Sequence, residues 1–339
     1  MKRPRRSTSS PRHVGSPRRA RPHLAPAALT AAALALAACA APTAPAPGEP
    51  PLPDAPDGGA PAPVATSLLG APLAPSPLPP RTRRRLELDL ESARMAFEDD
   101  PTELRAVWVG RRLAYLGRYE EAIDWYRDAL RDHPRSYRLR RHLGHRLITV
   151  RRIDEAVDAL AVARALAASA PNRVEPDGAP GPTGEPRSTT HGNIDYHLAL
   201  GHYARGEFDA AADLWLGCAR RWATNDDSRV AAIHWAYMSL LRAGRTEEAA
   251  RALDLVGPEP DVIENFAYLD LVQLYRGDLS AAALLERDSP NAALEYGLAR
   301  HLIRTGDAVR GERMLEALTA RPDWPAFGVL GAEADLARR

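Results

Sequence analysis

Gly117-Arg118-Tyr119-Glu120-Glu121-Ala122 and Arg151-Arg152-Ile153-Asp154-Glu155-Ala156 are two copies of one signature, and they decide the fold. The copies begin 34 residues apart, with apolar residues at helical spacing on either side. A repeat of this length predicts stacked helix-turn-helix units that bury their apolar faces against each other. We therefore expect an all-α chain, an α-α superhelix of about six helical hairpins that serves as a surface for holding a partner.

The first 38 residues have the features of a secretory leader. They contain eight basic residues and no acidic residue, ahead of the apolar stretch Leu24–Ala38. This alanine-rich stretch is 15 residues long, whereas a membrane span needs about 20 apolar residues. We therefore interpret residues 1–38 as a signal peptide rather than a transmembrane helix.

The end of this leader, Leu36-Ala37-Ala38-Cys39, resembles the lipobox of bacterial lipoproteins. The resemblance implies that Cys39 is lipidated on its sulfur and becomes the mature N-terminus. Several acyl chains on one residue anchor a protein stably, whereas a single chain holds it only marginally. We expect a membrane-anchored lipoprotein of the cell envelope, facing outside the cytoplasm. The alternative is ordinary secretion, with Cys39 discarded or left free.

Residues 39–85 are dominated by proline and alanine and offer few long apolar side chains to bury. Such a composition favours extended polyproline II and cannot offset its own ordering entropy. We expect a disordered tether here, so that a disordered N-terminal region precedes a repeat domain at 86–338.

The charge of the chain argues against nucleic-acid binding. Without the eight basic residues of the leader, 37 Lys and Arg remain against 44 Asp and Glu, a formal net charge near -7. Nucleic-acid binders draw most of their affinity from neutralised phosphates, so we expect no nucleic-acid partner. With Cys39 lipidated, Cys218 has no disulfide partner, and we expect it to be a buried structural thiol.

The repeat units resemble the tetratricopeptide repeat (TPR) family. The first full copy carries the consensus residues Gly110, Leu113, Gly117, Tyr119, Ala122, Tyr126, Ala129 and Pro134. Gly110 and Ala122 let the two helices approach closely, and Gly117 permits the tight turn between them. The resemblance covers roughly residues 87 to 338. It extends to bacterial repeat proteins of similar size, from which no activity carries over.

The later copies depart from this pattern. Arg151 stands where the second turn glycine would be, and the third turn, at Gly206, follows 55 residues later. The Pro/Gly-rich stretch 171–190 is therefore an inserted loop, which we expect either to lie over the groove as a lid or to be disordered. Further turns are expected at Gly244, Gly277 and Gly306. A final helix at about 326–338 should cap the stack, with Trp324 against the last hairpin.

The TPR resemblance also implies a ligand-binding groove, lined by the first helix of each hairpin. The corresponding residues are Val107, Arg111, Arg138, Arg141, His145, Tyr196, Leu200, Tyr203, His234 and Met238. The set is basic at its N-terminal end and aromatic after it. Arginine can fork onto carboxylates and tyrosine offers contact area at low entropic cost, so we expect an acidic peptide or chain terminus as ligand. The alternative is that the arginines form a solvated face.

A histidine cluster is the one candidate for metal chemistry. His142 and His145 are three residues apart, and His191, Asp195 or His197 could add a third ligand. The spacing matches no known ligand pattern, and HExxH, GxSxG, Walker A and GxGxxG motifs are absent from the sequence. We expect no metal, no cofactor and no enzymatic activity, and predict a scaffold or adaptor that binds a protein or peptide. The alternatives are a metal-dependent or hydrolytic envelope enzyme, or an architectural protein that forms homo-oligomers through its open ends.

Overall fold

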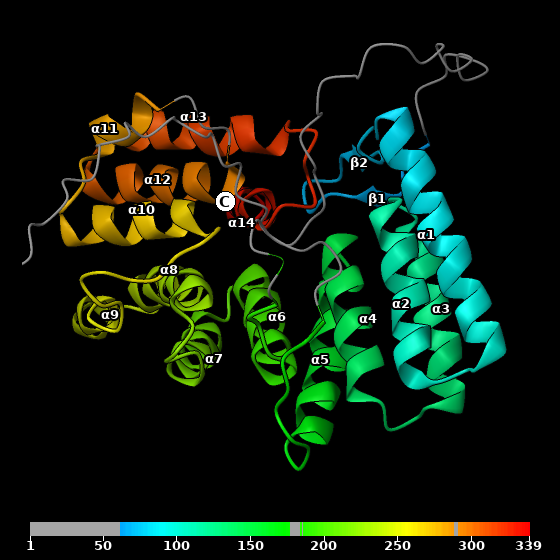
Figure 1. Cartoon of the computed structure of the whole chain (residues 1–339). Coiled ribbons are helices and arrows are strands. Elements are labelled where there is room, and N and C mark those ends of the chain that lie inside the picture. Colours follow the sequence, from blue (N-terminus) through cyan, green and yellow to red (C-terminus); the bar gives the residue numbers. More distant parts are fainter. Residues whose placement is uncertain (1–61, 177–183, 185, 288–290) are drawn as a thin grey trace, which may run out of the picture. The chain divides into compact units, whose positions relative to one another are not determined.

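The computed structural model describes residues 62–176, 184, 186–287 and 291–339, all within one unit of the chain (Figure 1). The predicted signal peptide, the lipidation site at Cys39 and the first part of the tether lie outside the described residues. No helix in the described ranges combines the length and the apolar character needed to cross a bilayer.

Helices make up most of the described part of the chain (Figure 1). The two short strands are β1 (Ala65–Thr66) and β2 (Pro72–Leu73). The helices of the N-terminal half are α1 (Pro80–Asp99), α2 (Glu103–Tyr115), α3 (Tyr119–Asp132), α4 (Tyr137–Thr149), α5 (Ile153–Ala167), α6 (Thr190–Arg205) and α7 (Phe208–Arg221). Those of the C-terminal half are α8 (Asp226–Arg242), α9 (Thr246–Leu253), α10 (Phe266–Arg276), α11 (Ala281–Leu285), α12 (Ala292–Thr305), α13 (Ala308–Thr319) and α14 (Phe327–Leu336).

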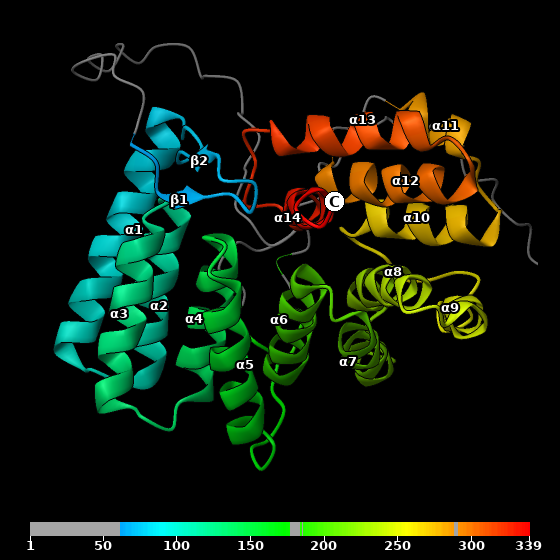
Figure 2. The ribbon, with the colours of Figure 1, turned by 180° about the vertical axis from the view of Figure 1, so that it is seen from behind.

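Helices α2 to α13 form successive helix-turn-helix units, as Figure 2 shows from behind. In each unit the turn contains one residue with positive φ, between 68° and 109°. These residues are Gly117, Arg151, Gly206, Gly244, Gly277 and Gly306. They are the six turns expected from the sequence, including those of the divergent C-terminal copies. The predicted all-α, TPR-like solenoid of about six hairpins is therefore confirmed, although α11 is a second helix of only five residues.

Small residues set the spacing within the units. A Cβ on Gly110 would clash with the ring of Tyr126, and one on Gly144 would clash with Leu160. The first helices α2, α4 and α6 contact one another in succession, as do α8, α10 and α12, and one continuous apolar core runs through the stack. Cys218 is fully buried in that core, which confirms the predicted structural thiol.

The last helix, α14, does more than cap the stack. It contacts α12 and α13, as a cap would, but it also contacts α6. Phe327, at its start, lies against the rings of His145, Tyr196 and His197, with ring centroids 5.7 to 6.2 Å apart. The inner side of the solenoid is therefore partly filled by the chain's own C-terminal helix, and the trough is narrower than the repeat pattern alone predicts.

Trp324 makes contacts with the N-terminal part of the chain that the sequence did not predict. Its ring contacts Tyr119 in the first repeat, with 5.6 Å between ring centroids, and its Nε1 donates to the Ala74 carbonyl at 2.6 Å. The guanidinium of Arg151 lies over the same ring at 5.4 Å. The segment before α1 thus supplies a hydrogen-bond acceptor for the indole, and the second repeat supplies a cation.

The tether boundary at residue 85 also differs from the structure. Strands β1 and β2 pair antiparallel, with Ala65 opposite Leu73, and Leu73 is buried. The Leu68 N–H donates to Glu333 at 3.0 Å, and α1 begins at Pro80, a favourable first helical residue. Composition hid this order because the segment is stabilised by residues about 250 positions later and not by a core of its own.

Candidate functional site on the inner helices

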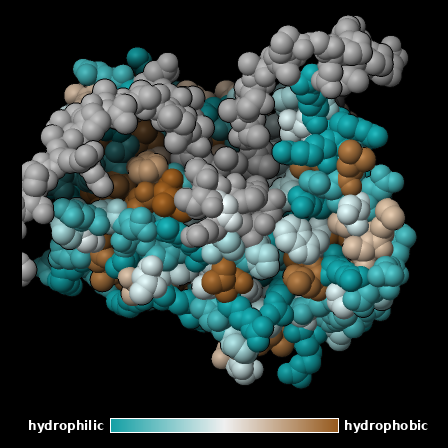
Figure 3. Space-filling view, viewed as in Figure 1, coloured by the Kyte–Doolittle hydropathy of each residue, from teal (hydrophilic) through white to brown (hydrophobic). Residues whose placement is uncertain are grey.

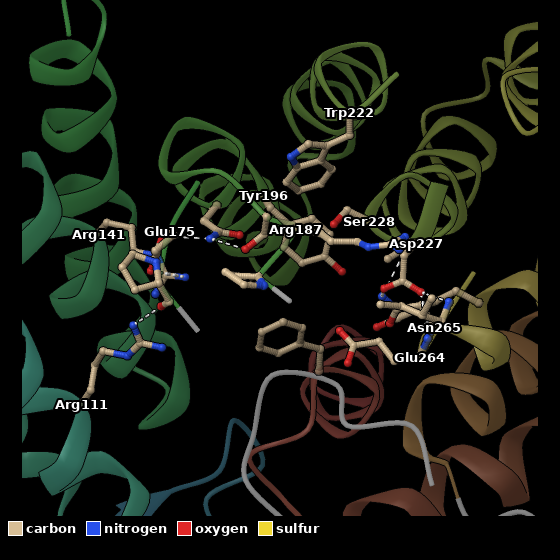
Figure 4. A pocket seen from close by; sticks show the side chains of 18 residues that line it. Arg111, Arg141, Glu175, Arg187, Tyr196, Trp222, Asp227, Ser228, Glu264 and Asn265 are labelled. Atoms are coloured by element: carbon tan, nitrogen blue, oxygen red, sulfur yellow. Dashed lines mark hydrogen bonds and ion pairs between the residues drawn. The ribbon is translucent and has the colours of Figure 1, made fainter. Parts of the chain in front are cut away.

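A pocket of about 100 Å³, the central pocket, opens on the inner side of the helical stack (Figure 4). Its walls come from α2, α4, α6, α8 and α14, from the inserted loop and from the segment before α10. The charged and aromatic residues that line it are Arg111, Arg141, Glu175, Arg187, Tyr196, Trp222, Asp227, Glu264, Tyr268 and Phe327.

A second pocket of about 350 Å³, the side pocket, adjoins the central pocket. The residues that line the side pocket alone are Leu104, Val107, Trp108, Arg138, His142, Arg173, Val174 and Thr190. Both pockets are lined by Arg111, Glu175 and Pro176. These three residues therefore form the partition between the two pockets.

Glu175 is the most strongly bound member of the partition. Its Oε1 lies 3.2 Å from both Arg141 Nη2 and His142 Nε2, and its Oε2 accepts a hydrogen bond from Asn193 at 2.9 Å. Burial would raise the pKa of this carboxyl, but Arg141, His142 and Arg111 together outweigh burial and hold the pKa below its ordinary value. The group is therefore a buried carboxylate with three donors around it.

His142 is neutral and its tautomer follows from its neighbours. Arg141 Nη1 lies 3.0 Å from His142 Nδ1, and since arginine can only donate, Nδ1 accepts. The ring proton is therefore on Nε2, which donates to Glu175. Burial and then the charge of Arg141 lower the pKa of His142 to about 3, so the ring carries no charge at pH 7.

Arg111 approaches the partition from α2. Its Nη1 donates to the Pro176 carbonyl at 2.6 Å, its Nε donates to the Tyr115 hydroxyl at 3.3 Å, and its guanidinium lies 4.5 Å from the ring centre of Trp108. Burial would lower the pKa of Arg111, but Tyr115 and Glu175 outweigh it and raise the pKa. Arg111 is thus a fixed cation that reaches both pockets.

Asp227 lies on the opposite wall of the central pocket from Arg111 and Arg141 (Figure 4). Its Oδ1 accepts the backbone N–H groups of residues 263–265 at 2.8, 2.9 and 3.1 Å, and its Oδ2 accepts from Asn265 Nδ2 at 2.8 Å. The carboxylate therefore holds the segment before α10 in place. Its charge is directed at these donors, which leaves the arginines as the groups best placed to attract a ligand.

The structure divides the ten residues that the sequence assigned to the groove. Arg111, Arg141 and Tyr196 line the central pocket; Val107, Arg111 and Arg138 line the side pocket; Met238 lines a separate pocket. The other four, His145, Leu200, Tyr203 and His234, are at most 5% exposed and pack inside the core. Tyr203, for example, shares a 2.6 Å hydrogen bond with Tyr296, and His234 accepts from or donates to Tyr275 at 3.0 Å.

Sequence reasoning missed the part of the site that comes from outside the first helices. Glu175 and Arg187 belong to the inserted loop, Trp222 follows α7, and Asn265 precedes α10. The local sequence did not indicate a binding role for Glu175 and Arg187, because both are surrounded by turn residues. The length of the insertion was the one available signal that the loop could reach the groove. Its middle, residues 177–183 and 185, lies outside the described residues.

The candidate metal ligands are not brought together. The rings of His145 and His197 are 4.2 Å apart between centroids, but His142 is bound to Glu175. Asp195 forms ion pairs with Arg164 and Arg221, at 2.8 Å each. Within the described ranges, no group of three or more His, Cys, Asp or Glu side chains is arranged to hold a metal ion.

The hairpins, the turns at positive φ and the pockets on the inner helices define a TPR-like solenoid protein. No family model and no curated protein matches the chain. One similar solved structure is a Podosopora anserina protein described as a kinesin light chain with nearly identical TPR-like repeats, with a TM-score of 0.40, 17% identity, and coverage of 69% of this chain and 95% of that one. Another is Naa15/Naa10 bound to HypK-THB, with a TM-score of 0.34, 20% identity, and coverage of 70% of this chain and 35% of that one.

Proposed function

We propose that this protein is a non-enzymatic scaffold or adaptor that binds an acidic peptide segment of a protein partner on its inner helices. The observation that carries the proposal is the pair of adjoining pockets, with Arg111 at their junction and at least one further arginine lining each. Arg111 reaches both pockets, Arg141 lines the central pocket and Arg138 the side pocket. Arginine binds carboxylates in a forked geometry, which suits such a ligand.

Aromatic residues add the contact area that a peptide ligand needs. Tyr196, Trp222 and Tyr268 line the central pocket, and Trp108 lines the side pocket. Rigid aromatic side chains contribute binding surface at low entropic cost, and Trp, Tyr and Arg are enriched at the energetic centres of protein interfaces. The lining is thus typical of a protein-binding site.

The binding test uses two pools of labelled heptapeptides that differ only at the central position, glutamate in one and glutamine in the other. We expect fluorescence anisotropy to show tighter binding of the glutamate pool. Arg111→Gln and Arg138→Gln should each weaken that binding about tenfold, since a charge-assisted hydrogen bond contributes about 1.5–3 kcal/mol. Arg141 is left unchanged because it is buried and its loss would leave the buried carboxylate of Glu175 without its ion-pair partner.

Arg131→Gln is the matched control. Arg131 is an arginine on α3 whose side chain is 80% exposed and lies in neither pocket. This variant should bind the glutamate pool as the wild type does. Equal binding of the two pools, or equal affinity in all four proteins, would contradict the proposed ligand and the proposed site.

We also propose that the scaffold is anchored in the cell envelope through lipid on Cys39, facing outside the cytoplasm. The support is the basic and apolar leader followed by Leu36-Ala37-Ala38-Cys39. Replacing Cys39 by serine should move the protein from the membrane fraction to the soluble fraction of a bacterial host. Unchanged fractionation would contradict lipid anchoring.

A further inference from the structure

The Val174–Pro176 segment of the inserted loop lies between the two pockets, against the inner helices. The loop's two limbs pair through antiparallel backbone hydrogen bonds, from Glu175 N–H to the Ser188 carbonyl at 2.9 Å and from Thr190 N–H to the Arg173 carbonyl at 3.0 Å. The segment is therefore extended, in the conformation that peptides adopt when they bind grooves through their main chain.

Contacts of the kind that a bound acidic peptide would make hold this segment. The carboxylate of Glu175 is held by donors from α4 and α6, and the carbonyl of Pro176 accepts from Arg111 of α2. By contrast, Val174 is 54% exposed, and Pro176 is also exposed. The segment has no buried apolar anchor, so another chain that brings a carboxylate and a carbonyl could replace it.

The site requires a carboxylate wherever it comes from. Arg141 is only 4% exposed, and Glu175 is the carboxylate that pairs with it at 3.2 Å. Leaving a buried charge without its partner is strongly unfavourable. Glu175 can therefore leave the site easily only when another acidic group takes its place.

Two residues that line the central pocket each carry a buried donor. Arg141 Nε and Trp222 Nε1 are buried and have no acceptor among the described residues. A buried donor without an acceptor is destabilising. A peptide carbonyl that enters beside Arg141 would give its Nε an acceptor, which the Val174–Pro176 segment does not supply.

We propose that the Val174–Pro176 segment is an internal competitor that occupies the ligand site of the groove. The ligand is then an extended peptide whose Glu or Asp carboxylate replaces that of Glu175 beside Arg141, His142 and Asn193. Displacement of the segment removes the loop's share of the partition, Glu175 and Pro176, and joins the central and side pockets into one groove. This inference rests on the proposed function, and it adds the recognised group and the means by which binding is regulated.

The test uses the full chain and a fluorescein-labelled peptide with the sequence of residues 170–176. The Glu175→Gln chain keeps an acceptor for Arg141 and Asn193 but gives up the competing charge. It should bind the peptide at least tenfold more tightly than the wild type does. A peptide with glutamine in place of its glutamate should bind the Glu175→Gln chain at least tenfold more weakly. Glu247→Gln on α9, where the side chain is 93% exposed, is the matched control and should behave as the wild type.

A second measurement uses the wild type alone, in case Glu175→Gln alters the fold. The backbone amides of Glu175 and Thr190 are protected by the pairing of the two limbs. Saturating acidic peptide should speed their hydrogen exchange at least tenfold, because displacement breaks that pairing.

The outcomes separate this inference from the proposed function. Equal affinity of the peptide for the wild type and Glu175→Gln chains, or unchanged exchange with peptide bound, overturns internal competition while the groove remains a binding site. Failure of every acidic peptide to bind any form of the chain overturns both.

Discussion

At the scale of the residue, Arg151 shows why a repeat can lose its turn glycine. Its φ is 68°, a left-handed conformation that costs a non-glycine residue roughly 1 kcal/mol or more. Its guanidinium makes two bonds of 2.7 and 2.9 Å to Glu333 and donates to the Trp324 carbonyl at 2.8 Å. Both members of the ion pair are buried. A side chain at this turn thus ties the second repeat to α14.

Replacing Arg151 by glycine should relieve the backbone but destabilise the protein. Among the described residues, it leaves the buried carboxylate of Glu333 with the Leu68 N–H as its hydrogen-bond donor. Breaking a buried ion pair on one side costs about 3–5 kcal/mol, more than the strain that is released. Urea unfolding should show this loss in the free energy of unfolding.

The double variant Arg151→Gly with Glu333→Gln provides the control. The glutamine oxygen can still accept the Leu68 N–H, but no charge is buried, so most of the lost stability should return. If the double variant is as unstable as the two single variants added together, the two residues are not coupled and the ion pair does not explain Arg151.

The sequence predicted the anomaly at Arg151 but not its cause. The missing glycine is visible by comparison with the neighbouring turns, whereas Glu333 is 182 residues away. The same distinction applies to the candidate site. Arg111 and Arg138 follow from their place on the first helices, but Tyr203 points into the core because Tyr296, from a distant repeat, supplies its hydrogen-bond partner.

At the scale of the element, the place of α14 is set by a close backbone approach. A Cβ on Gly328 would run into the carbonyl of Ala292 at the start of α12. The two helices can therefore pack together only with glycine at this position. Local pattern predicted a helix here, but a helix that is buried along nearly its whole length has no distinct apolar face to reveal which neighbour it contacts.

Gly328→Ala should accordingly destabilise the protein by about 1–3 kcal/mol, the usual cost of overpacking. Gly217→Ala is the matched comparison, because Gly217 lies within α7 and a Cβ there would meet no atom within 4 Å. That variant should gain about 1 kcal/mol from helix propensity. Thermal unfolding followed by circular dichroism compares the two, and similar shifts in Tm would contradict the assigned packing of α14.

Figure 3 gives the corresponding view of the surface. On the described part of the face that it shows, apolar residues form small separate groups among hydrophilic ones. Single exposed apolar residues are ordinary on protein surfaces. The candidate site is therefore distinguished by its pockets and charges and not by an apolar patch on this face.

At the scale of the whole molecule, four buried histidines extend through the inner helices α4, α6 and α8. Burial lowers the pKa of His142, His197 and His234 to about 3, and that of His145 well below its ordinary value. These rings stay neutral in the folded protein, whereas in the unfolded chain they take up protons below about pH 6.5.

Stability should therefore be nearly constant above pH 6.5 and should fall as the pH drops from 6.5 toward 3. Each ring adds a slope of about 1.4 kcal/mol per pH unit, because the unfolded state binds the extra proton. Urea unfolding at pH 7.5, 6.5 and 5.5 measures the free energy of unfolding at each pH. His234→Phe should reduce its slope against pH by the contribution of one ring. A free energy of unfolding that does not change between pH 6.5 and 5.5 would contradict neutral histidines.

The link between the two ends of the repeat array has a mechanical consequence. Leu68 bonds to Glu333 and Ala74 to Trp324, so residues near both ends of the described chain meet at one seam. When the chain is pulled between residue 62 and the C-terminus, these contacts bear the force first. The helical hairpins bear it only after the contacts have broken. Because forced unfolding is governed by the rate at which the first barrier is crossed, the pulling resistance of this protein is set by a few contacts beside α14.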